Sequence, residues 1–568
     1  MTSRCRHDAL VAFALAAVLS FTWAWRDWAN LAQLRLPDTD DVMRLQQIRD
    51  WLAGQSWFDL AQHRLGTGLQ MHWSRLADLV PGVMIAGLTP LIGQHGAELT
   101  AVIASPALSF GTALFLVVRI ARSLGGDILA VPAAIVAAIA YPATTIFLPG
   151  RIDHHGLQIV LLLAALLGML GQATPLRRAL AGAAAAASLV IGMETAPLLG
   201  VLGVVALADW IAGTDRDGEA LAGFAVGAFA GLVVGRIGFA GSGWDYPACD
   251  GFTAVAWTAA MTLAAAPILL AGLSGVATTL RARAIAAAAV VAIAAALALV
   301  RSPACVAPYG GVDPLLARLW LEHVGEAQSI LAADIATTLG YTGVMIAGLG
   351  ATLWRCRTGE RGWRILAALQ LAAFAITAVQ LRGAYVGAML AAPGLAALIV
   401  AARRRGGVRL AGAWLASAGM LYPIAANALT PTVRAHPSKG RDCESPAAIA
   451  ALARLAPGRV LAPIDAGPWI LAATHHRVIA APYHRNGAAD LAMYRFYGAR
   501  PHAAAAVADQ WRVDYVMVCA NMSDAAVPSS TAAALATGAL PGFIIRLRAR
   551  DGTAIFTRNR LSKPAPAL

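Results

Sequence analysis

Two short clusters of carboxylate and imidazole groups are suited to binding a divalent metal ion. The first is Asp38-Thr39-Asp40-Asp41, which has three carboxylates within four positions. Carboxylate oxygens are preferred ligands of Mg²⁺ and Mn²⁺, so this cluster is a candidate metal site. The same residues also suit the N-cap of an amphipathic helix running to Trp51, and the two interpretations are compatible.

The second cluster is Asp153-His154-His155-Gly156, which directly precedes an apolar run. One aspartate and two histidines within three positions can complete a metal site. The alternative is a capped helix start whose histidines lie at the membrane interface.

Two further clusters have groups that can bind an acceptor or a phosphate. Glu326 lies in the polar stretch 320–328, where it is a candidate ligand or acceptor-binding residue, unless this stretch is only an exposed amphipathic helix. Arg382 and Tyr385 open a later apolar run. Arginine binds phosphate or pyrophosphate through paired hydrogen bonds, although an arginine here can also simply extend toward the membrane surface.

A last group of candidates lies near the C-terminus, where polar residues follow strand-like runs. Such residues mark functional loops more often than core. Zinc binding is disfavoured because the histidines lack the paired spacing of zinc ligands. The candidates in this group are Asp465, Gly467, Trp469, His484 and Arg485.

The composition identifies the class of protein that carries these clusters. The chain has 568 residues, of which 58% are apolar and only 13% are charged. A soluble domain has roughly 25% charged residues, so a soluble globule is excluded. A disordered chain is also excluded, because the sequence is far too apolar. The net charge of +13 does not indicate nucleic-acid binding, because no basic face alternates with stacking aromatic residues.

Apolar runs of spanning length predict about thirteen transmembrane helices. The apolar stretch 79–93 contains Pro81 and Pro90, and we interpret it as a re-entrant or interfacial piece broken by these prolines. The first run favours an uncleaved span over a signal peptide, since no cleavage site precedes Arg26. The predicted spans lie near 9–25, 98–121, 128–147, 157–172, 179–193, 196–212, 219–240, 252–274, 283–300, 336–354, 363–381, 384–401 and 409–427.

The distribution of arginine predicts the orientation of these spans. Arginines gather in alternate loops, as expected for cytoplasmic loops, and only 213–218 fits poorly. We therefore expect a multi-pass protein of the bacterial inner membrane, with a cytoplasmic N-terminus and a periplasmic C-terminus. All the acidic clusters then fall outside, which favours an enzyme of the outer face over a proton-coupled transporter with ionisable groups at midplane.

The chain divides into two predicted domains. Residues 1–429 form the membrane domain, with a first outer loop at 26–97 and a large outer loop at 301–335. Residues 430–568 form a small extracytoplasmic α/β domain, with helices at 446–455 and 502–511. Its strand-like runs begin at Arg459, Arg477, Asp514, Phe543 and Ala554.

The topology also sorts the six cysteines of the chain. Cys5 and Cys356 fall inside, whereas the other four fall in the oxidising compartment, where disulfides form. Four cysteines allow three connectivities. Of these we predict a Cys443–Cys519 bond within the outer domain.

In their order along the chain, these clusters resemble motifs of the catalytic subunit of oligosaccharyltransferases. These are inverting, metal-dependent, GT-C-type membrane glycosyltransferases that use polyprenyl-linked donors. Asp40 and Arg49 are similar to the family's acidic D-P-x-x-x-x-R motif after the first span. Asp153-His154-His155-Gly156 resembles its D-N-E-G motif in the second outer loop.

The resemblance continues through the second half of the chain. Val324-Gly325-Glu326 is similar to the end of S-V-x-E, and Pro463 to Ile470 resembles W-W-D-Y-G-x-W-I. The span that opens at Arg382, with Tyr385 and Pro393, looks like R-F-x-x-Y-x-x-x-P. About thirteen spans with an outer C-terminus also fit the family.

The resemblance implies a site and a reaction. Asp40, Asp153 and His155 would hold a divalent metal, Mn²⁺ or Mg²⁺, and Arg382 with Tyr385 would bind the donor phosphate. Asp40 or Glu326 would orient the acceptor, so Asp40, Asp153 and Glu326 are the predicted catalytic residues. The implied activity is transfer of a sugar or oligosaccharide from a polyprenyl phosphate or pyrophosphate.

Two departures from the family pattern change the expectation. His155 replaces a glutamate, and imidazole suits Mn²⁺ better than Mg²⁺. Pro463 and Ile464 replace the two tryptophans of a motif that reads the acceptor sequon in that family. The sequence therefore predicts an acceptor that is a protein, a lipid or a glycan, without deciding among these three classes. The alternatives are a flippase or transporter of lipid-linked sugar, and a polymerase or ligase that joins glycans on lipid.

Overall fold

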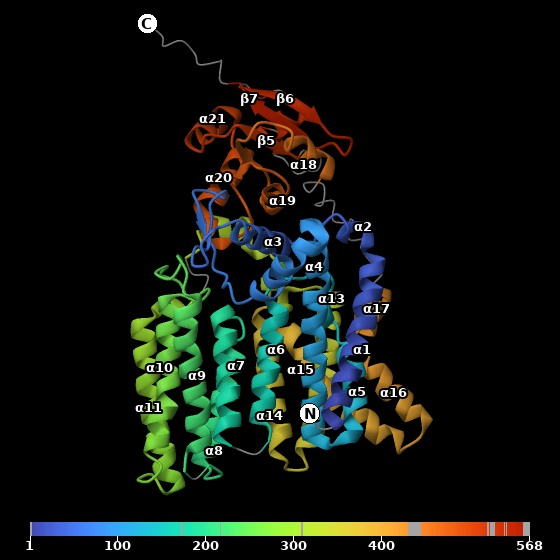
Figure 1. The fold of residues 1–568 in the computed structure, drawn as a ribbon, viewed down its shortest axis with the longest axis vertical. Helices are drawn as coiled ribbons and strands as arrows, with labels where there is room; N and C mark the ends of the chain where they lie inside the picture. The colour runs from blue at the N-terminus through green and yellow to red at the C-terminus, as the bar shows by residue number, and fades with distance from the viewer. Residues whose placement is uncertain are drawn as a thin grey trace. The chain divides into compact units, whose positions relative to one another are not determined.

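The computed structural model is described here for most of the chain, and these residues form two compact units. The first unit is built from the described residues within 1–35, 72–310 and 324–431, and the second from those within 36–71, 311–323 and 432–568. The described residues are 3–171, 174–215, 217–307, 311–429, 445–519, 522, 529–538, 540 and 542–559 (Figure 1).

The first unit is helical. Short 3-10 turns join some of its helices, including Ala143–Phe147 and Gly325–Ala327. Its helices are α1 (Ser3–Arg26), α2 (Trp28–Leu31), α4 (Leu79–Gly125), α5 (Ala130–Ala138), α6 (His155–Met169), α7 (Pro175–Ile191), α8 (Ala196–Ile211), α9 (Glu219–Phe239), α10 (Ala254–Gly272), α11 (Leu280–Arg301), α13 (Ile335–Cys356), α14 (Arg361–Val379), α15 (Gly383–Arg403), α16 (Gly407–Ser417) and α17 (Leu421–Leu429).

These helices confirm a polytopic α-helical membrane protein. Among the described residues, eight helices have the length and apolar composition to cross a membrane, namely α1, α4, α9, α10, α11, α13, α14 and α15. Other predicted spans correspond to helices that are too short or interrupted. The predicted spans near 128–147 and 409–427 each contain a break between two helical pieces. The count of thirteen therefore stays a prediction.

The start of α4 differs from the expectation drawn from its prolines. Pro81 lies in the first turn, where its missing N–H costs no helical hydrogen bond. The helix also continues through Pro90 and changes direction only at Gly93, whose φ is 74°. The predicted break at the two prolines is therefore wrong in position, because a glycine with positive φ makes the turn.

Glycines bring α7 and α9 into close contact, and Figure 1 shows these helices side by side. α9 has glycines at 223, 227, 231 and 235, one every fourth residue, which puts them on one helix face. A Cβ atom added at Gly227 would lie 2.0 Å from the carbonyl oxygen of Ala179 in α7. This small-residue face therefore lets the two backbones approach directly, as in other membrane helix pairs.

We expect Gly227→Ala to destabilise the first unit by about 1–3 kcal/mol, because the added methyl group forces α7 and α9 apart. The measurement is the thermal unfolding midpoint of the purified protein in detergent. Gly200→Ala is the matched control, since a Cβ there meets no atom within 4 Å. Equal midpoints for the two variants would contradict the close-packing argument.

The second unit confirms the predicted α/β domain. Its larger sheet has five strands, counted over the described residues. They are β3 (Arg459–Leu461), β4 (Arg477–Val478), β5 (Tyr515–Val518), β6 (Phe543–Arg548) and β7 (Ala554–Arg558). They form one sheet in the order β4-β3-β5-β7-β6. β3 is parallel to both β4 and β5, whereas β7 is antiparallel to its neighbours.

Helices and a small hairpin complete this unit. The hairpin strands are β1 (Ala61–Gln62) and β2 (Leu69–Gln70). Of the helices, α18 and α21 match the two predicted ones. The helices are α3 (Thr39–Leu52), α12 (Pro314–Leu319), α18 (Pro446–Leu452), α19 (Ala466–Ala473), α20 (Gly487–Gly498), α21 (Pro501–Gln510) and α22 (Thr531–Ala536).

Part of the predicted first outer loop belongs to this second unit. α3 packs against α19, and Arg49 Nη1 donates to the carbonyl oxygen of Ala472 at 3.1 Å. Arg64 donates to the carbonyl oxygens of Leu471 and Thr474 at 2.8 Å and 2.7 Å. The sequence assigns all of 26–97 and 301–335 to the membrane domain, whereas 36–71 and 311–323 join the second unit. Arginines that satisfy the last carbonyls of α19 account for part of this difference.

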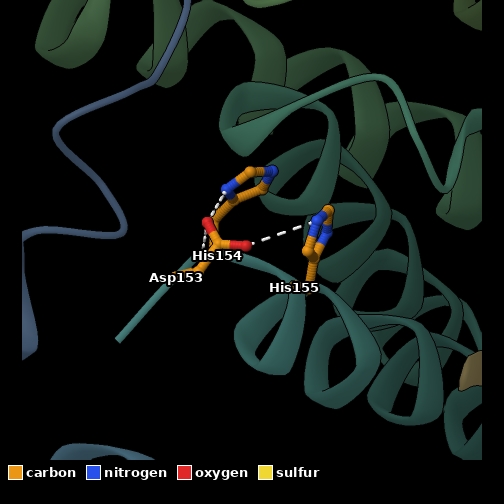
Figure 2. A group of neighbouring side chains, drawn as sticks. All are labelled: Asp153, His154 and His155. Carbon is orange, nitrogen blue, oxygen red and sulfur yellow. Dashed lines mark hydrogen bonds and ion pairs between the residues drawn. The ribbon is translucent and has the colours of Figure 1, made fainter. Parts of the chain in front are cut away.

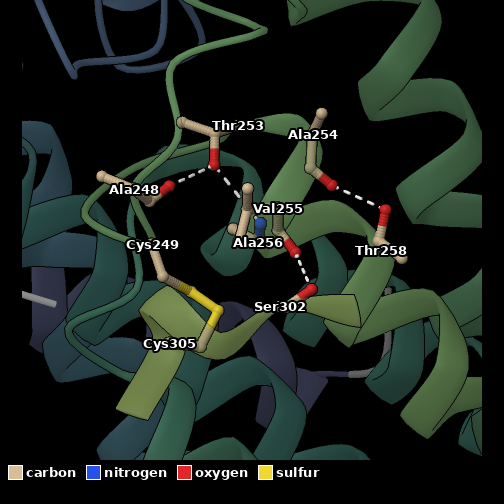
Figure 3. Close-up of a disulfide and its surroundings, with 9 residues drawn as sticks. All are labelled: Ala248, Cys249, Thr253, Ala254, Val255, Ala256, Thr258, Ser302 and Cys305. Atoms are coloured by element: carbon tan, nitrogen blue, oxygen red, sulfur yellow. Dashed lines mark hydrogen bonds between the residues drawn. A yellow bond between two sulfur atoms is a disulfide. The ribbon is translucent and has the colours of Figure 1, made fainter. Parts of the chain in front are cut away.

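A disulfide joins two segments at helix ends of the first unit. Cys249 precedes α10 and Cys305 follows α11, and Figure 3 shows the bond beside hydrogen bonds that fix both segments. The hydroxyl of Ser302 donates to the carbonyl oxygen of Val255 at 2.7 Å. The predicted Cys443–Cys519 pairing is compatible with this bond, but Cys443 lies outside the described residues.

Candidate functional site

The start of α6 gathers a candidate metal cluster. Asp153, His154 and His155 each have a potential ligand atom, and these atoms lie within 4.8 Å of one another. Figure 2 shows the Asp153 carboxylate between the two imidazoles. A turn at Gly150, with φ of 92°, leads into this segment, and its N–H donates to the carbonyl oxygen of Val102 at 2.8 Å. The side chains of Asp153 and His154 are only 3% and 4% exposed.

His154 is held between two carboxylates. Its Nδ1 contacts Asp153, and its Nε2 lies 3.2 Å from Oε1 of Glu194, which sits in the turn between α7 and α8. Burial alone lowers the pKa of His154, but Asp153 and Glu194 outweigh burial and raise it to about 10. Both ring nitrogens thereby contact carboxylates, so His154 is placed to orient Asp153, and the groups that remain able to hold a metal are those of its neighbours.

Glu194 is the half-buried counterpart of this imidazolium. Burial raises the pKa of Glu194, but the positive charge of His154 more than offsets it and holds the pKa well below its usual range. Gln158 of α6 donates to Oε2 of Glu194 at 2.8 Å. Neither Glu194 nor Gln158 is among the residues predicted from the sequence. The available signal was an acidic residue in a short turn between two apolar helices.

His155 faces the cluster from the other side. Its Nε2 lies 3.3 Å from Oδ2 of Asp153 and 4.0 Å from Oε2 of Glu326. These three groups converge, and their oxygen and nitrogen donors can hold a divalent ion. The predicted residues Asp153, His155 and Glu326 are thus brought together in the first unit.

Glu326 also connects the cluster to Arg382. Arg382 Nη2 lies 3.1 Å from Oε1 of Glu326, and the N–H of Arg382 donates to the carbonyl oxygen of Glu326 at 3.2 Å. The neighbouring N–H of Leu381 donates to the carbonyl oxygen of Gln328 at 2.8 Å. These two backbone hydrogen bonds therefore hold the loop that contains Glu326 against the start of α15.

A pocket lies beside these residues in the first unit, with a volume of about 400 Å³ that includes open space. One part of its lining is polar, with His155, Glu194 and Arg382. The other part is apolar and comes from α6, α8, α14 and α15, with Ile159, Leu198, Ile376 and Val386. Tyr385 also lines it. A cationic group next to an apolar wall is suited to a phosphate attached to a hydrocarbon chain.

The remaining predicted residues belong to the second unit. Asp38 is the N-cap of α3, as the sequence predicts, and its Oδ1 accepts from the N–H of Asp40 at 3.1 Å. Desolvation by the surrounding chain, and then the negative charge of Asp38, raise the pKa of Asp465. The hydroxyl of Tyr483 donates to the carbonyl oxygen of Thr39 at 3.3 Å. The acidic motif of the first loop therefore lies near the Asp465 segment within one unit.

The segment after Asp465 is closely packed. A Cβ at Gly467 would lie 2.2 Å from the carbonyl oxygen of Ala480, so only glycine fits there. Trp469 is half-buried on α19, and His484 is half-buried in the turn before α20. Arg485 Nη1 reaches the carbonyl oxygen of Met71 at 3.5 Å. These residues occupy loops and helix starts around β3 and β4.

Comparisons with known proteins show which fold contains this site. The chain superposes on the apo oligosaccharyltransferase of Archaeoglobus fulgidus with a TM-score of 0.65 and 16% identity, covering 92% of this chain and 70% of that one. With the archaeal oligosaccharyltransferase AglB of the same organism, in complex with an inhibitory peptide and a dolichol-phosphate, the TM-score is 0.62 at 15% identity, over 98% and 75% of the two chains. The chain has an oligosaccharyltransferase-like fold.

This oligosaccharyltransferase-like fold confirms the architecture expected from the motifs. No protein-family model matches the sequence, and no curated protein matches it. The likeness therefore resides in the arrangement of helices and strands, which is retained at 16% identity.

We expect Glu194→Gln to weaken divalent-metal binding by about 10- to 100-fold, because the neutral amide no longer holds His154 as the charged partner of Asp153. Mn²⁺ binding to the purified protein, followed by electron paramagnetic resonance, measures this. Glu219→Gln, at the exposed start of α9, is the control. Unchanged Mn²⁺ affinity in Glu194→Gln would refute the positioning role.

Asp490 supports the loop that contains His484 and Arg485. It is fully buried in α20, where its Oδ1 accepts from the N–H of Ala481 at 3.0 Å and from Asn486 Nδ2 at 2.6 Å. Burial raises the pKa of Asp490 well above its usual range. Ionisation of this carboxyl therefore costs stability once the pH exceeds the pKa of the unfolded chain, near 3.9.

We expect Asp490→Asn to be more stable than the wild type by roughly 1–3 kcal/mol at pH 8, because it removes that buried ionisation and keeps an acceptor oxygen. The advantage should shrink as the pH falls, since the wild-type carboxyl becomes protonated. Thermal unfolding midpoints from pH 5 to pH 8 test this. A loss of stability that is constant over this range would refute it.

Proposed function

We propose that this chain is a membrane glycosyltransferase that transfers a sugar or oligosaccharide from a polyprenyl phosphate or pyrophosphate to an acceptor. The observation that carries the proposal is the convergence of Asp153, His155, Glu326 and Arg382 beside a partly apolar pocket in an oligosaccharyltransferase-like fold. This reaction needs groups that can hold a metal ion and a group that can bind the donor phosphate, and the cluster and Arg382 are suited to these two roles.

A divalent metal fits the cluster. Asp153 and His155 would be its ligands, with Glu326 close enough to contribute an oxygen, and the mixed nitrogen and oxygen set favours Mn²⁺ over Mg²⁺. Asp40 is proposed as a further ligand from its motif. A structure of the Archaeoglobus fulgidus oligosaccharyltransferase in complex with Zn and sulfate supports a divalent ion in this fold. When bound, the metal supplies charge neutralisation for the departing phosphate, worth several kcal/mol.

Arg382 binds the donor phosphate in this proposal. Its guanidinium pairs with Glu326 in the structure and lines the pocket, so a donor phosphate would share or replace that pairing. Tyr385 borders the same space. The apolar lining suits the polyprenyl chain, and the complex of AglB with a dolichol-phosphate supports a donor of that class.

The chain's own carboxylates would orient the acceptor. Asp40 or Glu326 would accept a hydrogen bond from the nucleophile and align it in line with the departing phosphate, which gives inversion at the sugar carbon. This alignment requires no covalent intermediate on the protein. Loop contacts that fix Glu326 to the start of α15 hold the carboxylate in position.

The acceptor is proposed to be a protein, a lipid or a glycan, recognised by Asp465, Gly467, Trp469, His484 and Arg485. A related oligosaccharyltransferase is tethered to an acceptor peptide that contains the NVT sequon. This chain has Pro463 and Ile464 in place of the two tryptophans of the family motif. Because an aliphatic residue and a proline offer a different surface, we do not restrict the acceptor to a sequon.

The reaction is proposed to occur on the periplasmic side of the bacterial inner membrane, with the N-terminus in the cytoplasm. The Cys249–Cys305 disulfide supports this orientation, because disulfides persist in the oxidising periplasm. Cys305 begins the stretch that leads to Glu326, so the bond and the catalytic loop share one side.

We expect Asp153→Asn to lower sugar transfer from a polyprenyl-linked donor by at least about 100-fold, because the metal loses a charged ligand. Chelation with EDTA should abolish transfer by the wild type, and added Mn²⁺ should restore it. Asp245→Asn is the control, since Asp245 is an exposed carboxylate elsewhere in the first unit. The readout is release of the polyprenyl phosphate or pyrophosphate from a radiolabelled donor in membrane vesicles.

Retained transfer by well-expressed Asp153→Asn, or transfer that resists chelation, would refute the metal-dependent mechanism. Movement of the lipid-linked sugar across the bilayer without cleavage of its sugar–phosphate bond would instead support a flippase. Transfer only onto a lipid-linked glycan would identify a polymerase or ligase.

A further inference from the structure

A second cavity lies at the far end of α15 from Arg382. It has a volume of about 820 Å³, part of which is open space, and lies within the first unit. Its walls come from the end of α4, the turn after it, the end of α13 and the end of α15. The 21 residues of α15 span about 30 Å, so this cavity is about one membrane thickness from the candidate active site.

The lining of this cavity combines positive charge with apolar surface. Three arginines line it, Arg355, Arg404 and Arg405, and its lining has no acidic residue. Within the part of the chain that the structure describes, neither Arg404 nor Arg405 forms an ion pair. The apolar wall consists of Ile128, Leu129, Trp354, Ala397, Val400 and Ala401.

Neighbouring groups hold Arg355 in place. Its guanidinium lies 5.2 Å from the ring centroid of Trp363, and Nη2 is 3.5 Å from Oε1 of Glu360. Its Nε is buried and, among the described residues, has no hydrogen-bond partner. Asp127, in the turn after α4, is neutralised by Arg122 and Arg4 and does not compensate the cavity's charge.

This combination points to a lipid headgroup. An excess of arginine in cytoplasmic loops is ordinary. Arg404 and Arg405 are themselves exposed, but unlike Arg403 and Arg409 they also line a cavity that has an apolar wall. A soluble anion would use the guanidinium groups without needing the wall of aliphatic side chains. Basic pockets between transmembrane helices bind anionic phospholipids, whose phosphate and acyl chain match both parts of this lining.

We propose that this cavity binds one anionic phospholipid of the membrane, at a site distinct from the donor site. Its phosphate lies against Arg404, Arg405 and Arg355, and an acyl chain follows the wall formed by Ala397, Val400 and Ala401. The ligand class is a phosphatidylglycerol- or cardiolipin-type phosphodiester. This inference does not depend on the proposed transferase activity.

Binding is tested with the full chain purified in a neutral detergent and titrated with phosphatidylglycerol, phosphatidylcholine or inorganic phosphate. Native mass spectrometry measures the lipid adduct and its dissociation constant. We expect a retained phosphatidylglycerol adduct and no comparable phosphatidylcholine adduct. The double variant Arg404→Gln/Arg405→Gln should bind phosphatidylglycerol roughly 10- to 30-fold more weakly, since each arginine is worth about a factor of five.

The matched control is Arg403→Gln/Arg409→Gln, which removes the same charge from exposed positions that do not line the cavity. Ala401→Leu provides a second variant, because it fills the apolar wall and leaves every arginine intact. It should weaken the lipid adduct while the thermal unfolding midpoint stays within a few degrees of the wild type.

Three outcomes would overturn the proposal. Equal weakening by the control double variant would mean diffuse charge attraction. Inorganic phosphate that competes with phosphatidylglycerol at equal concentration would mean a free-anion site. An unchanged adduct in both Arg404→Gln/Arg405→Gln and Ala401→Leu would place the lipid elsewhere.

Discussion

Pairing of the few charges in a very apolar chain is the constraint on which the rest of the structure depends. An isolated charge among apolar helices costs several kcal/mol, so a charged carboxylate buried between such helices is stabilised by a cation nearby. Asp8 of α1 is buried and pairs with Arg119 and Arg122 of α4. Arg361 of α14 donates through Nε to Asp209 of α8 at 2.8 Å. These pairs connect helices that are distant in sequence, and the candidate active site is built by the same rule.

At the site, pairing positions groups as well as stabilising them. Alternating charges lie in a line through Glu194, His154 and Asp153. The central imidazolium of His154 contacts one carboxylate with each of its ring nitrogens. Asp153 is thereby fixed with its other oxygen toward His155. On the far side, Glu326 occupies the space between His155 and Arg382. A ligand set that is oriented before a metal or phosphate arrives loses less entropy on binding.

Close backbone packing supports this line of charges. Glu194 lies in the short turn after α7, and α7 is fixed against α9 through glycines that bring the backbones into contact. A few small residues thus determine where a charged side chain sits. In the second unit, a comparable role falls to Arg49 and Arg64, which bind the last carbonyls of α19 and attach the first-loop segment to the sheet domain.

The sequence by itself determined the class of protein, the helical membrane part, the five strands of the C-terminal sheet and most of the residues that gather at the candidate site. It could do so because apolar run length, strand alternation and motif order are local properties. Only the tertiary structure decided that Glu194 and Gln158 complete the site, that Gly93 and not Pro90 turns α4, and that 36–71 packs with the second unit. Each of these depends on contacts between residues far apart in the chain, such as the 40 positions that separate His154 from Glu194. The spacing of residue types along a sequence carries no information about such partners.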